Sequence, residues 1–334
     1  MKARFLVAAA ALSLLAAGCG VSENTASGPA AANPNGCTGK SDATATAPTG
    51  LTLALVPSGD ANKLVQSVKP LEAALTQRLG IPVKGVITQD YQAAVEAIGA
   101  DQAQIGFLPS LQMIQACTRY GADSVLQTQR NKKISYAAQF FTNNPSKYCA
   151  DTPTPDAKGN LFCNGTTAGN GPAGLDELPK IKGSTMALLQ AASPAGYIFP
   201  AAALKKAGVD VTKDVKPVQV TANDASVLAV YRGDAEVGVS YWDARTVVQK
   251  DTPDVGKKVV TFALTDEIPN DGVSLSGKLS PEWQQKITTA LTDYAGTPDG
   301  VAALTAIYQI TGLAPADLAA LQRTQEAAAS IGLG

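Results

Sequence analysis

The chain has 334 residues, a net charge of −1 and 45% hydrophobic residues, which suits two domains or one large α/β domain. It contains no histidine, and this excludes Ser-His-Asp catalysis and histidine-bearing zinc sites. No basic run stands out, so nucleic acid is not an expected partner.

The first residues have the layout of an export signal. Lys2 and Arg4 precede an apolar stretch, Phe5 to Ala17, that is too short to span a bilayer as a mature helix. Small residues then lead to Cys19, and "LLAAGCG" resembles a bacterial lipobox. We therefore expect a signal peptide over 1–18 and an extracytoplasmic protein lipid-anchored through Cys19. The alternative is an ordinary signal peptide with an incidental cysteine.

Residues 19–50 predict a disordered tether, because small and polar residues dominate and no apolar period is present. The tether contains "TGKS", the end of a phosphate-loop motif. Pro34 occupies the place of that motif's first glycine and no strand precedes it, so we reject the match.

Strand and helix patterns alternate from residue 51 onward. Leu51, Leu53 and Leu55 predict a strand with one buried face, and apolar residues at helical spacing follow from Leu64. Pro70 lies inside that helical stripe, so a kink or a second helical segment is expected there. The next expected elements are a strand over 81–88, a helix over 90–100, a strand over 103–109 and a helix from 110.

Residues 142–183 are rich in Gly, Pro, Asn and Thr and are too long for an ordinary connection. We interpret them as a surface insertion that acts as a lid or partner contact, or as a decorated loop. Four cysteines besides Cys19 indicate two disulfides, with three possible pairings. Cys149 and Cys163 flank one loop of the insertion, which favours that pair and leaves Cys37 with Cys117.

The alternation resumes after the insertion. Strands are expected over 184–191, 215–220 and 235–242, with helices over 194–208 and 223–233 between them. This order predicts an α/β fold with mainly parallel sheets flanked by helices, arranged as two lobes.

Seven short motifs follow one another in a recognisable order: "LVPSGD", "KPLEAAL", "DYQAAVEAI", "IGFLPS", "SPAGYIFP…LKKAGVD", "NDASVLAVYRGDAEVG" and "IPND". Together they resemble the substrate-binding proteins of phosphate, phosphite and phosphonate ABC importers, over roughly residues 51–315. The resemblance implies a type II-like periplasmic-binding-protein fold, with two lobes joined by crossover strands near 133–141 and 259–266. Lobe 1 would comprise 51–138 and 264–334, lobe 2 would comprise 139–263, and ligand would bind between them.

Candidate ligand-binding residues lie where strands end and helices begin. Five share this position: Ser58, Tyr91, Ser110, Ser193 and Asn223. Ligands of open α/β sheets bind at such ends, and helix N-termini attract anions through unpaired N–H groups. We expect Ser193 and the backbone N–H groups near Gly196 and Tyr197 to hold an anionic group.

The turn at Ser193 departs from the family pattern, which usually reads Ser-Thr-Ser-Gly-Tyr. Pro194 and Ala195 replace two hydroxyl positions, and proline also lacks an N–H donor. Asn223 stands where the family often has histidine, and an asparagine cannot carry charge. These departures argue against tight binding of bare inorganic phosphate.

The resemblance also implies a site for a positive group. Asp243 and Asp271 fall where aminophosphonate-binding members have two carboxylates for the ligand's ammonium, and Tyr91 matches a cleft tyrosine. Strand alternation would place Tyr241 on the same side as Asp243. The alternatives are a solvated loop carboxylate for Asp243, a turn residue for Asp271, and core or hinge packing for Tyr241 and Trp242.

The leading hypothesis is a monomeric binding lipoprotein that delivers a small anionic or zwitterionic solute, of phosphonate type, to an ABC permease. We expect no cofactor and no metal. A ligand-sensing lipoprotein subunit and a binding protein for an organic amine are alternatives. An exported enzyme is a further class, but no GxSxG or HExxH motif supports it.

Overall fold

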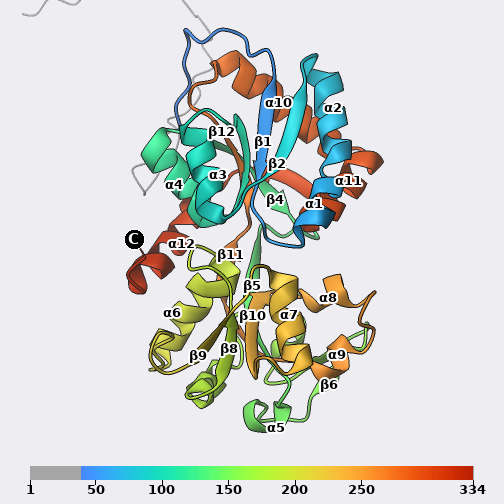
Figure 1. Ribbon diagram of the computed structural model, residues 1–334, viewed down its shortest axis with the longest axis vertical. Coiled ribbons are helices and arrows are strands. Elements are labelled where there is room, and N and C mark those ends of the chain that lie inside the picture. Colours follow the sequence, from blue (N-terminus) through green and yellow to red (C-terminus); the bar gives the residue numbers. More distant parts are fainter. Residues whose placement is uncertain (1–38, 334) are drawn as a thin grey trace, which may run out of the picture. The chain divides into compact units, whose positions relative to one another are not determined.

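The computed structural model describes residues 39–333, which all belong to one compact unit. The predicted signal peptide, Cys19 and Cys37 lie outside the described residues, so the Cys37–Cys117 pairing stays a prediction. Two sheets, each flanked by helices, form the unit (Figure 1). We call the region around the first sheet lobe 1 and the region around the second sheet lobe 2.

The sheet of lobe 1 is mixed, which corrects the expectation of a mainly parallel sheet. Its strand order is β13-β4-β12-β3-β1-β2; β1 is parallel to both neighbours, whereas β12 and β13 pair antiparallel. The antiparallel pairs arise because the chain returns from lobe 2 to complete this sheet. The strands are β1 (Leu51–Leu55), β2 (Val83–Ile87), β3 (Ile105–Leu108), β4 (Asp123–Gln129), β12 (Gly272–Leu275) and β13 (Gly312–Pro315).

The helices of lobe 1 cover both faces of this sheet. The predicted break at Pro70 is confirmed, since one helix ends at Ser67 and the next begins at Lys69 with Pro70 in its first turn. Leu71 and Leu75 of the second segment are fully buried in the core. The helices are α1 (Ala61–Ser67), α2 (Lys69–Leu79), α3 (Tyr91–Gly99), α4 (Ser110–Tyr120), α10 (Pro281–Ala295) and α11 (Pro298–Tyr308).

The sheet of lobe 2 is also mixed, with the order β6-β7-β11-β5-β10-β8-β9. β8 is parallel to β9 and β10, whereas β5 pairs antiparallel with β10 and β11 because it enters the lobe and β11 leaves it. The strands are β5 (Ser135–Thr142), β6 (Thr154–Pro155), β7 (Leu161–Phe162), β8 (Thr185–Leu188), β9 (Lys216–Gln219), β10 (Val237–Tyr241) and β11 (Val260–Pro269).

The insertion contributes to the core of lobe 2 and carries the predicted disulfide. Cys149 is bonded to Cys163, which confirms that pairing. β7 pairs with β11, and Phe162 and Tyr148 are fully buried. The helical segments of lobe 2 are α5 (Pro145–Tyr148), η1 (Thr166–Ala168), η2 (Leu175–Ile181), the single π-helical turn η3 (Pro194–Ile198), α6 (Phe199–Lys206), α7 (Asn223–Arg232), α8 (Arg245–Val248) and α9 (Val255–Lys258).

Two short crossovers connect the lobes. Residues 130–134 lead from β4 into β5, and Asn270 and Asp271 lead from β11 into β12. The buried Asn270 ties the crossovers together, since its Nδ2 donates to Thr128 O at 2.7 Å and to Lys133 O at 3.0 Å. Because the crossovers lie outside β5 and β11, both strands belong wholly to the sheet of lobe 2, and the chain passes from one sheet to the other at the crossovers.

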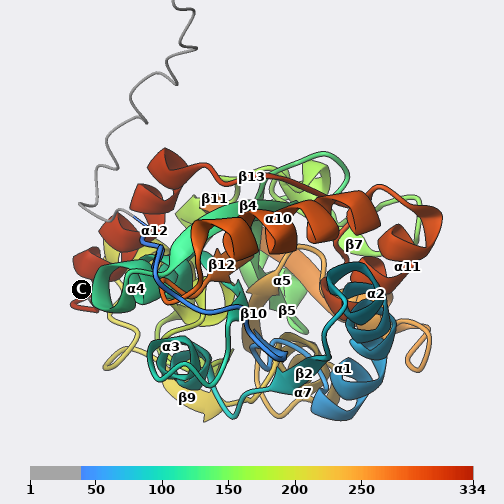
Figure 2. The same ribbon diagram turned by 90° about the horizontal axis from the view of Figure 1, so that it is seen from above.

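The C-terminal helix α12 (Leu318–Ser330) contacts both lobes. It packs on α4 of lobe 1, as Figure 2 shows, and on α6 of lobe 2. At the other end of the described chain, Lys40 N donates to Gly121 O at 2.9 Å, so the described part of the predicted tether lies against lobe 1. Within residues 39–333, no helix combines the length and apolar character needed to cross a bilayer.

Candidate functional site

A cleft of ≈ 430 Å³ lies between the lobes and at the crossovers. Its walls combine hydroxyls, aromatic rings and a few charged groups. The lining residues include Ser58, Asp60, Lys63, Tyr91, Phe107 and Tyr308 of lobe 1, Arg130, Tyr136 and Asp271 near the crossovers, and Ser193, Pro194, Ala195, Asn223, Asp224, Tyr241 and Trp242 of lobe 2.

Five of the predicted site residues meet in this cleft. Ser58 follows β1, Tyr91 and Asn223 open α3 and α7, Ser193 caps η3, and Asp271 lies in the second crossover. Asn223 Nδ2 of lobe 2 donates to Ser58 O of lobe 1 at 3.1 Å, so the lobes touch directly across the cleft. The side-chain oxygen of Asn223 is buried and has no hydrogen-bond partner among the described residues, which leaves one acceptor for a ligand.

The turn at Ser193 offers fewer donors than its sequence predicts. Ser193 Oγ accepts from Gly196 N at 3.1 Å, and Ser193 O accepts from Tyr197 N at 3.0 Å. The N–H groups of Gly196 and Tyr197 are thus engaged within the turn, and neither residue lines the cleft. Because Pro194 has no N–H, Ala195 supplies the remaining backbone donor at this helix start.

Ser110 also lies outside the cleft. Its side chain is buried, and its Oγ accepts from Thr324 Oγ1 of α12 at 2.8 Å. The neighbouring Pro109 lines the cleft instead. The strand-end position of Ser110 was therefore identified correctly, but its hydroxyl joins α4 to α12.

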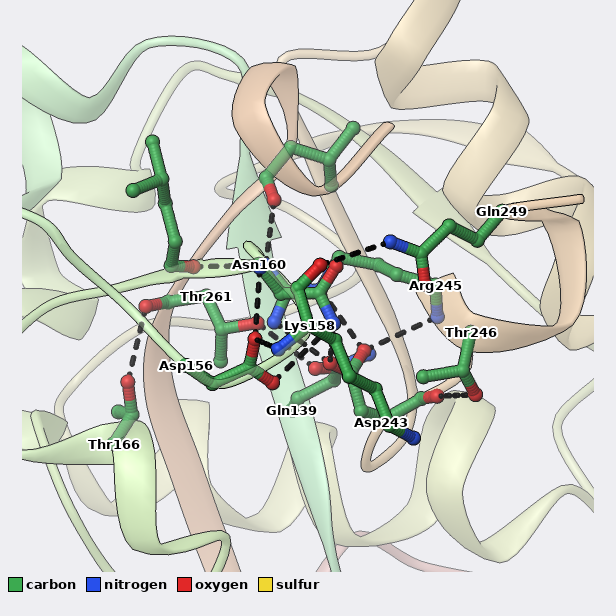
Figure 3. Close-up of polar contacts among 12 residues, drawn as sticks. Gln139, Asp156, Lys158, Asn160, Thr166, Asp243, Arg245, Thr246, Gln249 and Thr261 are labelled. Carbon is green, nitrogen blue, oxygen red and sulfur yellow. Dashed lines mark hydrogen bonds and ion pairs between the residues drawn. The ribbon is translucent and has the colours of Figure 1, made fainter. Parts of the chain in front are cut away.

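Asp243 lies in a separate buried network (Figure 3). Its carboxylate accepts from Arg245 Nε at 2.9 Å and from Arg245 Nη2 at 2.8 Å. Gln139 and Asn160 also donate to it, each at 3.4 Å. Strand alternation fails at this point because β10 ends at Tyr241, so Asp243 belongs to the turn that follows. Both carboxylate oxygens are occupied, and Asp243 does not line the cleft.

Asp271 lines the cleft but is paired with Arg130, at 3.0 Å between Oδ2 and Nη2. Arg130 also donates from Nε to Tyr308 O at 3.0 Å and from Nη1 to Thr128 Oγ1 at 3.3 Å. Burial alone would lower the pKa of Arg130, but the Asp271 carboxylate more than offsets this and raises it. The guanidinium therefore stays charged and keeps two of its five N–H groups for the cleft.

Four tyrosines surround this ion pair: Tyr91, Tyr136, Tyr241 and Tyr308. Burial raises the pKa of Tyr91 to about 12, with a smaller opposing contribution from its hydrogen bond to Ser193. Burial likewise raises the pKa of the other three above the ordinary value. All four phenols stay protonated at neutral pH. Tyr308 already donates its hydroxyl proton to Val56 O, so the hydroxyls of Tyr91, Tyr136 and Tyr241 are the potential donors to an anion.

A family model described as the periplasmic substrate-binding protein of a phosphonate ABC transporter matches residues 53–321, most of the chain. The chain belongs to this family. The match confirms the family that the seven motifs predicted. Members of this family are substrate-binding components of importers.

The chain is also similar in sequence to a named relative and in fold to solved structures. It is 23% identical over 253 residues to the phosphate-import protein PhnD of Mycolicibacterium smegmatis, covering 72% of this chain and 71% of that protein. PhnD1 from Prochlorococcus marinus, solved with methylphosphonate, has a TM-score of 0.71 at 16% identity, covering 86% of this chain and 100% of that one. A phosphonate-transporter binding protein from Pseudomonas aeruginosa has a TM-score of 0.67 at 17% identity, covering 84% and 93%. The predicted two-lobe fold is confirmed.

Sequence reasoning missed Arg130, Tyr136 and Tyr308 as cleft residues of this family member. The polar run "RNKK" lies between two strands, at the crossover that borders the cleft, and was a usable signal for Arg130. Tyr308 carried no such signal, since it ends α11 and reaches the cleft only through the packing of lobe 1.

Proposed function

We propose that this protein holds a small organophosphonate or related oxyanion in the cleft and delivers it, as a monomer, to an ABC permease without transforming it. The observation that carries the proposal is Arg130, a charged guanidinium in the cleft with two N–H groups that no described residue accepts from. Charge-assisted hydrogen bonds to an oxyanion are about twice as strong as neutral ones, and a guanidinium fork matches phosphonate oxygens.

The hydroxyls around Arg130 support the same ligand class. Ser58 and Tyr91 line the cleft from lobe 1, and Tyr136 and Ser193 line it from lobe 2. A bound oxyanion would accept from both sides, and this favours the closed arrangement of the lobes. The scarcity of backbone donors at Ser193 makes these side chains, rather than a helix start, the principal partners.

A second candidate ligand is a phosphonate that also carries an ammonium group. Asp60 and Asp224 line the cleft, and neither forms an ion pair among the described residues. Aromatic rings and unpaired carboxylates together suit a cation. In this proposal Asp224 takes the role that the sequence assigned to Asp243.

Titration calorimetry with methylphosphonate, phosphate and 2-aminoethylphosphonate tests the function. Arg130→Gln should weaken all three ligands by about tenfold to a hundredfold, because one charge-assisted bond contributes about 1.5–3 kcal/mol. Arg119→Gln is the matched control, since Arg119 pairs with Glu96 on the surface of lobe 1. Asp224→Asn should weaken only the aminophosphonate.

The proposal is wrong if none of the three ligands binds, or if Arg130→Gln binds all of them as the parent does. Asp271→Asn gives a further check. It leaves Arg130 charged and removes its partner, so oxyanion binding should be kept or strengthened.

We further propose that Cys19 anchors the mature protein to a membrane, as the lipobox resemblance suggests. The Cys19→Ser variant should move from the membrane fraction to the soluble fraction of fractionated cells. A variant that stays as firmly in the membrane fraction as the parent would contradict the anchor.

A further inference from the structure

A second cavity of ≈ 260 Å³ adjoins the cleft. The two share five lining residues: Arg130, Tyr136, Trp242, Thr246 and Gln309. The second cavity, which we call the side cavity, thus begins at the guanidinium that the cleft presents to a ligand. A solute held at Arg130 could extend from one space into the other.

The insertion builds a wall of the side cavity, through Asp156, Lys158 and Gly169. Gly169 has φ +67°, and a Cβ atom there would lie 2.5 Å from the Trp242 ring. Only glycine therefore allows the insertion to approach the indole so closely.

This wall is fixed by the buried network around Asp243 (Figure 3). Arg245 Nη1 donates to Leu161 O at 2.8 Å, and Gln249 Nε2 donates to Lys158 O at 3.2 Å. Asn160, at the end of the same loop, donates to Asp156 and Asp243. The loop that bears Lys158 is thus held at both of its ends.

The side cavity offers more unused donors than acceptors. Among the described residues, the Lys158 ammonium forms no ion pair and the Lys133 ammonium donates only to Asn170 Oδ1. Within residues 39–333, Trp242 Nε1 is buried and has no hydrogen-bond partner. By contrast, the Asp156 and Asp243 oxygens already accept hydrogen bonds, and Glu267 accepts one from Gly171 N. A group that accepts hydrogen bonds and carries negative charge matches this set.

We propose that the cleft and the side cavity form one elongated site for phosphonates whose organic substituent ends in a carboxylate. Arg130 and the cleft hydroxyls hold the phosphonate, and Lys158, Lys133 and Trp242 Nε1 receive the carboxylate. This inference rests on the proposed function, because it places the phosphonate at Arg130. It gives the insertion a role in selecting the substituent.

Calorimetry with length-matched pairs tests the inference. Ethyl-, propyl- and butylphosphonate are compared with phosphonoacetate, 3-phosphonopropionate and 4-phosphonobutyrate, which differ from them by the terminal carboxylate. At the best chain length the carboxylated ligand should bind about tenfold tighter than its alkyl partner. Lys158→Gln and Trp242→Phe should each reduce that ratio severalfold, and Lys158→Gln, which lies outside the cleft, should leave methylphosphonate affinity unchanged. Lys213→Gln, at an exposed site away from both cavities, should change neither.

Equal or weaker binding of the carboxylated ligands at all three lengths would overturn the inference, and so would a ratio that both variants leave intact. Loss of methylphosphonate binding in Arg130→Gln, together with equal binding within the pairs, would uphold the proposed function and reject the elongated site. Failure of methylphosphonate and every pair to bind would reject both.

Discussion

Two Arg–Asp ion pairs lie near each other in this protein and have different consequences. Arg245–Asp243 joins its atoms at 2.8 Å with side chains that are 0% and 6% exposed, whereas Arg130–Asp271 joins at 3.0 Å with 25% and 17% exposed. Four of the five N–H groups of the Arg245 guanidinium end on protein acceptors, and the Phe162 ring covers it at 4.4 Å. Arg130 uses three.

The difference shows that residue type does not decide which ion pair serves a ligand. What decides is whether donors remain that face a cavity. The Arg245–Asp243 pair joins the insertion to Val259, the residue before β11, and to the turn after β10, so it fixes a wall of the side cavity. The Arg130–Asp271 pair joins the two crossovers and keeps N–H groups for the cleft.

Breaking the buried pair should have the largest effect. Arg245→Gln leaves the Asp243 carboxylate without its counter-charge, and the free energy of unfolding should fall by about 3–5 kcal/mol. Urea unfolding measures this. Arg130→Gln should cost clearly less stability, because its partner is partly solvated; an equal loss would erase the contrast between the pairs.

Asp243→Asn gives the matched measurement on ligand selectivity. It should leave the ratio of aminophosphonate to alkylphosphonate affinity unchanged, since Asp243 lies outside the cleft. A changed ratio would restore the role that the sequence suggested for this residue.

Removing the Cys149–Cys163 disulfide, as a double serine variant, is the next largest change. The bond closes a loop with a sequence separation of 14, for which chain entropy predicts a loss of about 3 kcal/mol. Because the loop carries Asn160 and Lys158, the wall should loosen while the cleft is kept. Hydrogen exchange should rise in residues 149–163; unchanged exchange there would contradict this.

Tyr91, which lines the cleft beside the Arg130–Asp271 pair, gives a test by pH. Burial raises the pKa of Tyr91 from 10.0 to about 12. The contribution of the protonated phenol to folding stability is therefore complete below pH 10 and is lost as pH rises through 12. At pH 11 the unfolded phenol is ionised and the folded one is not, which lowers the free energy of unfolding by about 1.4 kcal/mol. The parent should therefore lose that much more stability than Tyr91→Phe between pH 8 and pH 11. Equal losses of stability in the parent and in Tyr91→Phe would contradict a raised pKa for Tyr91.

Ser193→Ala should have the smallest effect. Its Oγ caps η3 by accepting from Gly196 N, and losing such a cap costs about 1 kcal/mol. Affinity for methylphosphonate should fall less than in Arg130→Gln, because the cleft keeps several other hydroxyls. A larger fall than in Arg130→Gln would make Ser193 the principal anion partner.

Local sequence patterns were sufficient for the order of elements and for part of the cleft. The helix break at Pro70 and the residues at strand ends follow from spacing and capping rules that act within a few residues. Ser58, Tyr91, Ser193, Asn223 and Asp271 accordingly lie in the cleft. The number of backbone N–H donors free at Ser193 could not be predicted in this way, because it depends on hydrogen bonds formed within the turn.

Contacts between distant segments decided the remainder. Arg245 lies two residues from Asp243, but their burial depends on Asn160 and Leu161, more than eighty residues earlier in the chain. The mixed sheets have the same origin, since antiparallel neighbours such as β12 and β4 are supplied by a returning chain. Alternation along the sequence carries no information about such returns.

The position of β12 has a consequence for how the chain is made. β12 lies between β3 and β4, yet it is synthesised after the whole of lobe 2. Until Gly272–Leu275 emerge, β3 and β4 each present an open edge, and such edges invite pairing with other chains. All of lobe 2, from β5 to β11, is synthesised while these edges are open, so nascent chains are most prone to aggregate between the emergence of β4 and the insertion of β12.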